Sequence, residues 1–330
     1  MIELHCHLDG SLSKEDISYL CRINHKEDID LNAIKLTADK SVRSLNDYLQ
    51  CFDFPISVLQ TAESITYATY SLYKRLASQG IVYAEVRFAP QQHTSHGLTQ
   101  EQAVMASLSG LEMAKRETQI AGQLILCCMR GANTNAANKK TIDVAASFFG
   151  KGVCAVDLAG AEALYPNESF QEEFKMARDL NLPITIHAGE ASGANSVWSA
   201  IKMGATRIGH GIHAAEDPQL LEFLAMTKIG LEVCPTSEVD TCAIPSYESC
   251  PVPLFLKKGL LFTLATDDMM VSNITIGEEY RKAAKAFSLN EEERKKLYLN
   301  AVEMAFLDTE KKAFLRDLVL KKLQNPADEF

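Results

Sequence analysis

Eight short apolar runs, rich in β-branched residues, recur along the chain and alternate with longer segments whose apolar positions have helical spacing. Several runs are apolar on both faces, as parallel strands are when helices cover one side of the sheet and a barrel interior fills the other. The pattern predicts eight strands, at IELHCH (2–7), IVYAEVRF (81–88), QLILCCM (123–129), VCAVDLAG (153–160), PITIHAG (183–189), RIGHG (207–211), LEVCP (231–235) and LFTLATDD (261–268).

The segments between these runs predict amphipathic helices, most clearly at 103–117, 169–182 and 217–230. In the last of them Asp217 is the expected N-cap, Pro218 fits the first helical position, and Gly230 marks the expected end. Eight alternations of strand and helix predict an α/β fold, a (β/α)8 TIM barrel that forms one domain over residues 1–330. An open doubly wound sheet is the main alternative, but no glycine-rich phosphate loop follows the first run.

Two segments fall outside the regular alternation. The first connection, residues 11–80, is long and carries the aromatic piece LNDYLQCFDFPISVLQT (45–61). This piece either packs into the core or forms a lid over the barrel mouth, because long loops at that end are often functional. The tail, residues 291–324, predicts two closing helices with charged outer faces.

Composition narrows the class of protein. With 330 residues, of which 47% are hydrophobic and 23% charged, the chain can bury a large core, which excludes disordered and fibrous classes. The net charge of -10 argues against a nucleic-acid partner. Nine cysteines without CxxC spacing are typical of a reducing compartment, and neither a leader nor an apolar run of ~18 residues is present. We expect a cytoplasmic protein without a membrane partner, either a monomer or a weak homo-oligomer.

Ionisable residues stand where four of the predicted strands end, and catalytic groups of a TIM barrel lie at those ends. Each has an ordinary structural explanation alone, such as a helix cap or a buried, hydrogen-bonded imidazole. Together they would bring several ionisable groups to one small opening, which indicates a functional site. They are His5, His7 and Asp9 at the end of the first strand, His187 at the end of the fifth with Glu190 three residues on, His210 on the sixth, and Asp267 and Asp268 at the end of the eighth.

Barrel geometry indicates which of these groups bind a metal. Residues two apart in a strand share a face, so His5 and His7 project together. Strands one and eight become neighbours through closure and strand five lies across from them, so His187 and Asp267 can reach the same point. Three imidazoles and a carboxylate suit Zn²⁺ in a site that keeps a place for water. No lysine ends the fourth strand to bridge a second ion, so we expect one zinc ion per chain.

The remaining groups predict a hydrolase. Zinc lowers the pKa of a bound water toward ~7, which supplies hydroxide at neutral pH. His210 is placed to hold that water, Glu190 can carry a proton to the substrate, and Asp268 is free to bond a ring nitrogen or hydroxyl. The residues alone leave the substrate open.

The segments HCHLDGS, YAEVRFAPQ, LILCCMR, DLAG, HAGEASG, RIGHGI, LEVCPTS and TDD, in this order over nearly the whole chain, resemble the bacterial-type adenosine deaminase family of the metal-dependent amidohydrolases. The resemblance implies a purine nucleoside substrate and hydrolysis of adenosine and 2′-deoxyadenosine, with adenosine giving inosine and ammonia after zinc hydroxide adds to C6. The resemblance implies four zinc ligands, His5, His7, His187 and Asp267, of which His7 also borders the substrate. It implies that Glu190 protonates the purine N1 atom and that His210 orients the hydroxide. It further implies that Asp268 bonds N7, that the Gly160 backbone N–H donates to N3, and that Asp9 reaches the ribose.

Some positions depart from the pattern that the resemblance implies. Glu238 and Asp240 stand in a run that is usually more neutral, and Cys250 and Met269-Met270 are also unusual. We expect these residues to border the mouth of the site and to influence which purine is accepted.

Other functions remain open. The substrate could instead be adenine or a 5′-modified adenosine, whereas a 5′-phosphate is disfavoured because the loops offer few cations besides Lys14. A non-catalytic barrel that binds a purine or a protein is disfavoured because every ligand and the acid are present. A hydrolase of cyclic amides or esters is disfavoured because Glu190 with Asp268 suits a nitrogen-containing ring.

Overall fold

The computed structural model describes residues 1–324, so the last six residues of the expected 1–330 unit lie outside the described part. Each of the eight predicted strands is present, with bounds within a few residues of those expected. They are β1 Ile2–His7, β2 Tyr83–Phe88, β3 Ala121–Met129, β4 Val153–Ala159, β5 Thr185–Ala188, β6 Arg207–His210, β7 Gly230–Val233 and β8 Phe262–Leu264.

The strands close into a barrel. Strands β1 to β4 and β5 to β8 form two parallel four-stranded sheets, in sequence order. Bridges between Val156 and Ile184 and between Cys6 and Asp267 join the two sheets at both seams. At the second seam the backbone N–H of His7 donates to the carbonyl of Asp267 over 2.8 Å. The (β/α)8 prediction is confirmed, and the doubly wound alternative is wrong.

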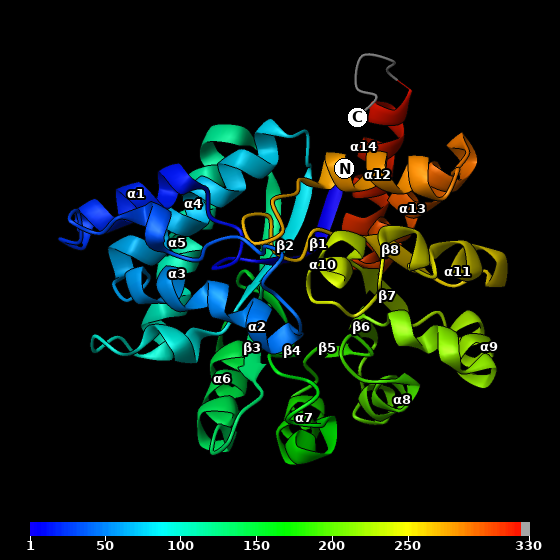
Figure 1. Ribbon diagram of the computed structural model, residues 1–330, viewed down its shortest axis with the longest axis horizontal. Helices are drawn as coiled ribbons and strands as arrows, with labels where there is room; N and C mark the ends of the chain where they lie inside the picture. Colours follow the sequence, from blue (N-terminus) through cyan, green and yellow to red (C-terminus); the bar gives the residue numbers. More distant parts are fainter. Residues whose placement is uncertain (325–330) are drawn as a thin grey trace.

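Helices surround the barrel, as Figure 1 shows, and the closing pair α13 and α14 lies beside the N-terminal strand. The α-helices are α1 Lys14–Ile23, α2 Leu45–Leu49, α3 Asp53–Val58, α4 Ala62–Ser78, α5 Gln100–Thr118, α6 Asn135–Phe148, α7 Gln171–Asp179, α8 Ala194–Lys202, α9 Pro218–Thr227, α10 Pro235–Asp240, α11 Val252–Lys258, α12 Ile276–Ala286, α13 Glu291–Met304 and α14 Thr309–Leu323. Short 3₁₀ helices are η1 Leu31–Ala33, η2 Gln50–Phe52, η3 Pro90–His93, η4 Asn167–Phe170, η5 Ile212–Glu216 and η6 Tyr247–Ser249. Within residues 1–324, none of these helices combines the length and apolarity that a membrane crossing needs.

The start of α9 is as predicted, but its end is not. Asp217 caps the helix by accepting from the Gln219 N–H at 2.8 Å. The helix ends before Gly230, at a left-handed Lys228, and Gly230 is the first residue of β7. Glycine is needed there for a different reason: a Cβ at this position would lie 2.7 Å from the Met304 side chain of α13.

The contact between α4 and α5 also depends on a glycine. A Cβ added at Gly110 of α5 would lie 2.2 Å from the Thr66 carbonyl oxygen of α4. We expect Gly110→Ala to lower the free energy of unfolding by about 1–3 kcal/mol, because the helices must separate or shift. Urea unfolding measures this, with Ser109→Ala at the exposed neighbouring position as the control. Equal stability of the two variants would contradict the close approach.

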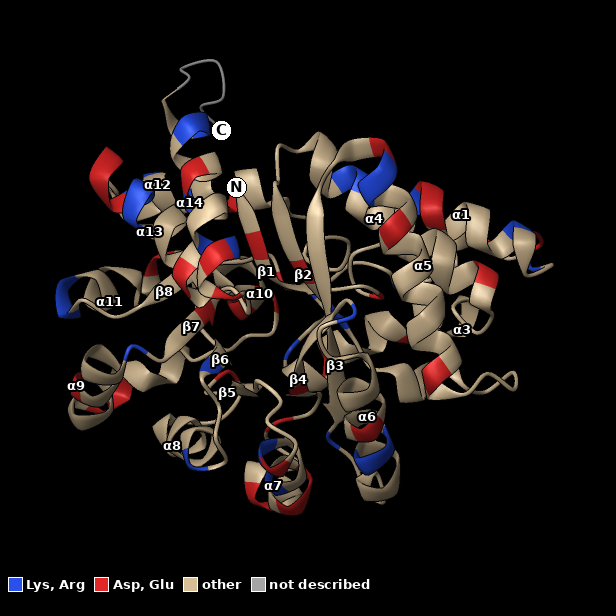
Figure 2. Cartoon of the chain, turned by 180° about the vertical axis from the view of Figure 1, so that it is seen from behind, with Lys and Arg blue, Asp and Glu red and all other residues tan. Residues whose placement is uncertain are grey.

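Charged residues occupy two different environments. On the outer helices acidic and basic residues are interspersed, as Figure 2 shows, so the visible face carries no basic stripe. The barrel interior also holds ionisable side chains that are fully or almost fully buried. These are Glu3, Glu85, Arg87, Asp157, Arg207 and Glu232. Arg87 and Arg207 form ion pairs with the carboxylates of Asp157, Glu232 and Glu85, and these pairs lead to the functional site. Glu3 has no cationic partner within residues 1–324, and burial raises its pKa to about 8.

Candidate metal centre and active site

Four predicted ligands converge where the strands end. His5 and His7 come from β1, His187 from β5, and Asp267 from the segment after β8, and one donor atom of each lies within 4.8 Å of the others. The Asp267 Oδ1 atom is 3.1 Å from His5 Nε2 and 3.4 Å from His7 Nε2. The Nε2 atoms of His7 and His187 are 3.1 Å apart. The structure therefore brings together the set expected from barrel closure.

This cluster has the geometry of a metal site. Four donors at about 2.0–2.1 Å from one ion in tetrahedral arrangement are separated by about 3.3 Å, close to the separations of 3.1–3.4 Å in the cluster. The buried Nε2 of His5 makes no hydrogen bond within residues 1–324, although Asp267 Oδ1 lies 3.1 Å from it. A cation between the donors would bind the lone pair of His5 Nε2. It would also offset the repulsion between the facing Nε2 lone pairs of His7 and His187. The residues present fit a metal ion.

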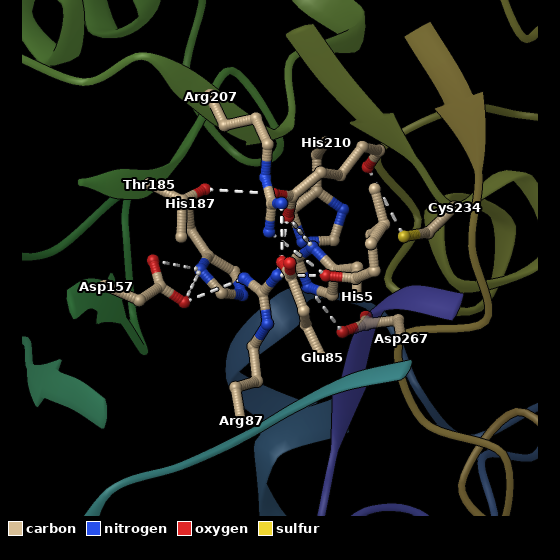
Figure 3. A network of polar contacts seen from close by, with 12 residues as sticks. His5, Glu85, Arg87, Asp157, Thr185, His187, Arg207, His210, Cys234 and Asp267 are labelled. Atoms are coloured by element: carbon tan, nitrogen blue, oxygen red, sulfur yellow. Dashed lines mark hydrogen bonds and ion pairs between the residues drawn. The ribbon is translucent and has the colours of Figure 1, made fainter. Parts of the chain in front are cut away.

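Two buried carboxylates orient the imidazoles. Glu232 on β7 lies 2.7 Å from His5 Nδ1, and Asp157 on β4 lies 3.0 Å from His187 Nδ1. Each carboxylate accepts the Nδ1 proton, so each ring turns Nε2 toward the centre, a common arrangement around metal ligands. Arg87 of β2 bonds both carboxylates, at 2.8 Å and 2.7 Å, and Figure 3 shows it beneath the two rings.

The surroundings favour the metal-binding protonation state of three of the four ligands, His7, His187 and Asp267. Burial lowers the pKa of His7 well below its usual value, and it lowers the pKa of His187 to about 4 despite the Asp157 carboxylate. Burial opposes the charge of Asp267, but His5 and the neighbouring imidazoles keep the pKa of Asp267 well below its usual range. Neutral imidazoles with an ionised carboxylate are the ligand forms.

Glu190 and His210 lie beside the cluster without belonging to it. The Glu190 Oε2 atom is 3.6 Å from His210 Nε2, and both side chains are buried. Burial raises the pKa of Glu190 to about 8. Burial lowers the pKa of His210, but the Glu190 and Glu238 carboxylates outweigh it and raise that pKa well above 6.5. The pair can therefore hold and transfer protons near neutral pH.

The loop that carries Glu190 is fixed by another carboxylate. Glu162 accepts hydrogen bonds from four consecutive backbone N–H groups, residues 189–192, at 2.7–3.1 Å, and from the Ser196 hydroxyl. Sequence reasoning missed this role of Glu162, although its position two residues after Gly160 of the DLAG segment was a signal.

The other candidate residues line one cavity of about 230 Å³. Asp9, Gly160 and Asp268 face it together with His7, His187, Glu190, His210 and Asp267. The wall formed by α2, η2 and α3 is mainly apolar, through Leu45, Leu49, Phe52 and Ile56, with Tyr48 and Asp53 as its polar residues. Gly160 has a φ of +105°, a conformation that favours glycine. Among the described residues, no lysine or arginine lines the cavity.

Asp268 is held in the cavity by a tyrosine that sequence reasoning did not find. Its Oδ2 atom accepts from the Tyr48 hydroxyl of α2 at 3.1 Å, while Oδ1 has no hydrogen-bond partner among the described residues. Burial raises the pKa of Asp268 well above its usual value, with the charges of Asp267 and Asp9 acting in the same direction. Gly10 is required beside it, because a Cβ there would lie 1.8 Å from Asp268 Oδ1.

The residues expected at the mouth are elsewhere. Glu238, Cys250, Met269 and Met270 are buried and do not line the cavity, and neither does Asp240. Glu238 lies behind His210, at 3.1 Å from its Nδ1 atom. The expectation is wrong for Glu238, because the segment after β7 folds at once into α10 and turns this side chain inward. The other four positions do not line the cavity either.

Comparison with known sequences gives one family. The sequence model described as adenosine deaminase matches residues 1–322. A protein named adenosine deaminase from Haemophilus ducreyi is 44% identical over 327 residues, which cover 96% of this chain and 94% of that protein. Another of the same name, from Enterococcus faecalis, is 38% identical over 96% of this chain and 95% of its own length.

Solved structures agree on the fold. Adenine deaminase from Arthrobacter aurescens has a TM-score of 0.88 and 25% identity, covering 98% of this chain and 99% of its own. An amidohydrolase from Burkholderia ambifaria, solved with bound zinc, has a TM-score of 0.89 over 99% of this chain and 91% of its own; at 20% identity, this likeness concerns the fold alone. On the family match and the sequence identities together, the chain belongs to the adenosine deaminase family.

Proposed function

We propose that this protein is a zinc-dependent deaminase that hydrolyses adenosine and 2′-deoxyadenosine, with adenosine giving inosine and ammonia. The observation that carries the proposal is that the four-donor cluster, the buried acid Glu190 and the carboxyl of Asp268 face one cavity in a member of this family. Deamination of a purine requires hydrogen-bonding groups in the plane of the ring and a nucleophile at the carbon that carries the amino group. Glu190 and Asp268 would supply the hydrogen bonds, and a metal held by the four donors would supply the nucleophile.

We assign the metal to His5, His7, His187 and Asp267. Nitrogen and oxygen donors in this ratio suit Zn²⁺, which favours four-coordinate sites and, in catalytic sites, also binds water. A zinc ion held by these four residues would lower the pKa of water toward ~7 and would thereby supply the nucleophile at neutral pH. Glu232 and Asp157 keep the ligand rings turned toward the ion.

The cavity residues bind and orient the purine. The Gly160 backbone N–H donates to N3, and Asp268, anchored by Tyr48, bonds N7 through its unpartnered Oδ1 atom. Asp9 reaches the ribose hydroxyls. These contacts place C6 beside the metal cluster and N1 beside Glu190, because the contacting groups line the same cavity.

Glu190 supplies the proton that makes C6 electrophilic. With a pKa of about 8 its carboxyl holds a proton at neutral pH and donates it to N1. His210 lies 3.6 Å from Glu190 and holds the attacking water. Addition of water to C6 interrupts the ring's aromaticity, and protonation of N1 stabilises the product of that step. One proton of the added water reaches the departing amino group, which leaves as ammonia, and the other returns to Glu190 as the C6 oxygen becomes a carbonyl.

The apolar wall of α2, η2 and α3 suggests how the cavity closes. We propose that residues 45–58 act as a lid within the predicted segment 11–80, and that the chain forms one domain. Exclusion of bulk water by this wall strengthens the polar contacts inside. We further propose a cytoplasmic protein, monomeric or weakly self-associating, without nucleic-acid or membrane partners, in line with its cysteine pattern and negative net charge.

The preferred substrate is tested by comparing purines. We expect the ultraviolet absorbance change of deamination with adenosine, and its loss on chelation of the metal. AMP should react at least about 100-fold more slowly in kcat/KM, because no lysine or arginine among residues 1–324 lines the cavity to pair with phosphate.

Adenine and 5′-modified adenosines are run beside adenosine as the second candidates, since an adenine deaminase is among the similar structures. Faster turnover of adenine than of adenosine would overturn the assignment of Asp9 to the ribose. Absence of turnover with every purine, in protein that holds zinc, would overturn the proposed function.

A further inference from the structure

Glu238 is an unexplained carboxylate in the active-site region. It lies in α10, inside the ring of outer helices in Figure 1, and its side chain is fully buried. No lysine or arginine forms an ion pair with it among residues 1–324, where its one ion-pair partner is His210. Burying a carboxyl group without a partner is costly, and the contact with His210 offsets part of that cost.

His210 is held between two carboxyl groups at opposite nitrogens. Its Nδ1 atom is 3.1 Å from Glu238 Oε1, and its Nε2 atom is 3.6 Å from Glu190 Oε2. A ring nitrogen that faces a buried carboxylate carries the proton, so Nδ1 donates to Glu238 and Nε2 faces the cavity. The backbone of His210 has a φ of +61°, between two glycines, which limits where the ring can lie.

We propose that Glu238 is a positioning residue for deamination, holding the proton on Nδ1 and the orientation of the His210 ring so that Nε2 faces the attacking water. This inference rests on the proposed function. It assigns Glu238 to the chemical step, whereas its departure from a run that is usually more neutral had indicated a role in choosing the substrate. A carboxylate behind an imidazole performs the same task in hydrolases whose histidine acts on a nucleophile.

The same three residues do not fit a second metal site as well as they fit this arrangement. Glu190, His210 and Glu238 form a compact group of possible donors. However, the short contacts use different nitrogens of one ring, so the two carboxyl groups lie along opposite edges of the imidazole and not around one point. The three side chains therefore lie in a row, with the His210 imidazole between the carboxyl groups of Glu190 and Glu238.

The test compares Glu238→Leu and Glu238→Gln with wild type, all loaded with zinc. Leucine cannot accept the Nδ1 proton, and the glutamine amide can present its NH₂ group to Nδ1 and favour the wrong tautomer. We expect kcat with adenosine to fall on the order of 10- to 1,000-fold, most in the leucine variant. KM should change by less than about threefold and zinc content should stay at one per chain, because Glu238 touches neither the cavity nor the metal cluster.

Two further measurements separate positioning from a purely structural effect. Glu279→Gln is the matched control, because Glu279 is a buried carboxylate on the neighbouring α12 that bonds Tyr247 and lies outside the site; its kcat should match wild type. The ¹⁵N shifts of His210 report the tautomer directly, with Nδ1 protonated in wild type and altered in both Glu238 variants.

Each outcome decides the proposal. An unchanged kcat in folded Glu238→Gln, or an unchanged His210 tautomer in both variants, would overturn it. So would a loss of kcat that Glu279→Gln shares. If wild type deaminates no purine, the proposed function fails, yet the ¹⁵N shifts still show whether Glu238 fixes the tautomer of His210. If Glu238→Leu fails to fold, the isosteric glutamine variant carries the test.

Discussion

Glu190→Gln should retain its metal and lose most of its turnover, by roughly 10²- to 10⁴-fold in kcat. The amide has the size of the carboxyl group but cannot donate an acidic proton to the purine N1 atom. Metal binding should persist because Glu190 is not one of the four converging donors. Steady-state kinetics with adenosine and metal analysis of the same preparation measure the two effects.

The pH profile sharpens this experiment. In wild type, kcat/KM should fall as the pH rises through about 8, because only the protonated Glu190 can act as the acid and burial raises its pKa to that value. The glutamine variant should lack this alkaline limb. Glu216→Gln, at an exposed position, serves as the control and should keep both rate and profile. Loss of metal with retained activity in Glu190→Gln would contradict the role of the acid.

The fold and the metal cluster could be predicted because both follow from strand periodicity and barrel closure. The apolar runs locate the strands, and the two-residue spacing of His5 and His7 gives them a common face. Placing the last strand beside the first and the fifth across the barrel then brings Asp267 and His187 to that face. No side-chain detail is needed for this step, so the sequence suffices.

The surrounding residues could not be predicted in the same way. Glu232 and Asp157 were visible as acids inside apolar strands, but which nitrogen each one bonds depends on the register of β4 and β7. Glu238 was placed at the mouth, yet one helical turn after β7 points it behind His210. The end of α9 was misjudged because Gly230 is required by packing against Met304 and not by a helix cap.

His187→Ala should abolish stoichiometric metal binding. The variant removes the donor that comes from β5, across the barrel from β1, and leaves Asp157 without the imidazole that it orients. Loss of a partner that only orients a ligand costs about 10- to 100-fold in metal affinity, so loss of the ligand itself should cost more. Metal analysis after dialysis should find far less than one ion per chain, and turnover should fall with it.

Two comparisons make the result specific to the cluster. Asp157→Asn should give an intermediate loss of affinity, because it keeps the His187 ring but weakens the bond at Nδ1. His93→Ala removes another buried imidazole, one that bonds the Leu59 carbonyl away from the cluster, and should leave the metal content unchanged. A chelator should lower the melting temperature of wild type and of His93→Ala but not of His187→Ala, since a bound ion stabilises the folded state only where it binds. Full metal occupancy in His187→Ala would show that His187 is not a ligand. It would also contradict the inference that barrel geometry brings a donor from β5 to the ligands on β1.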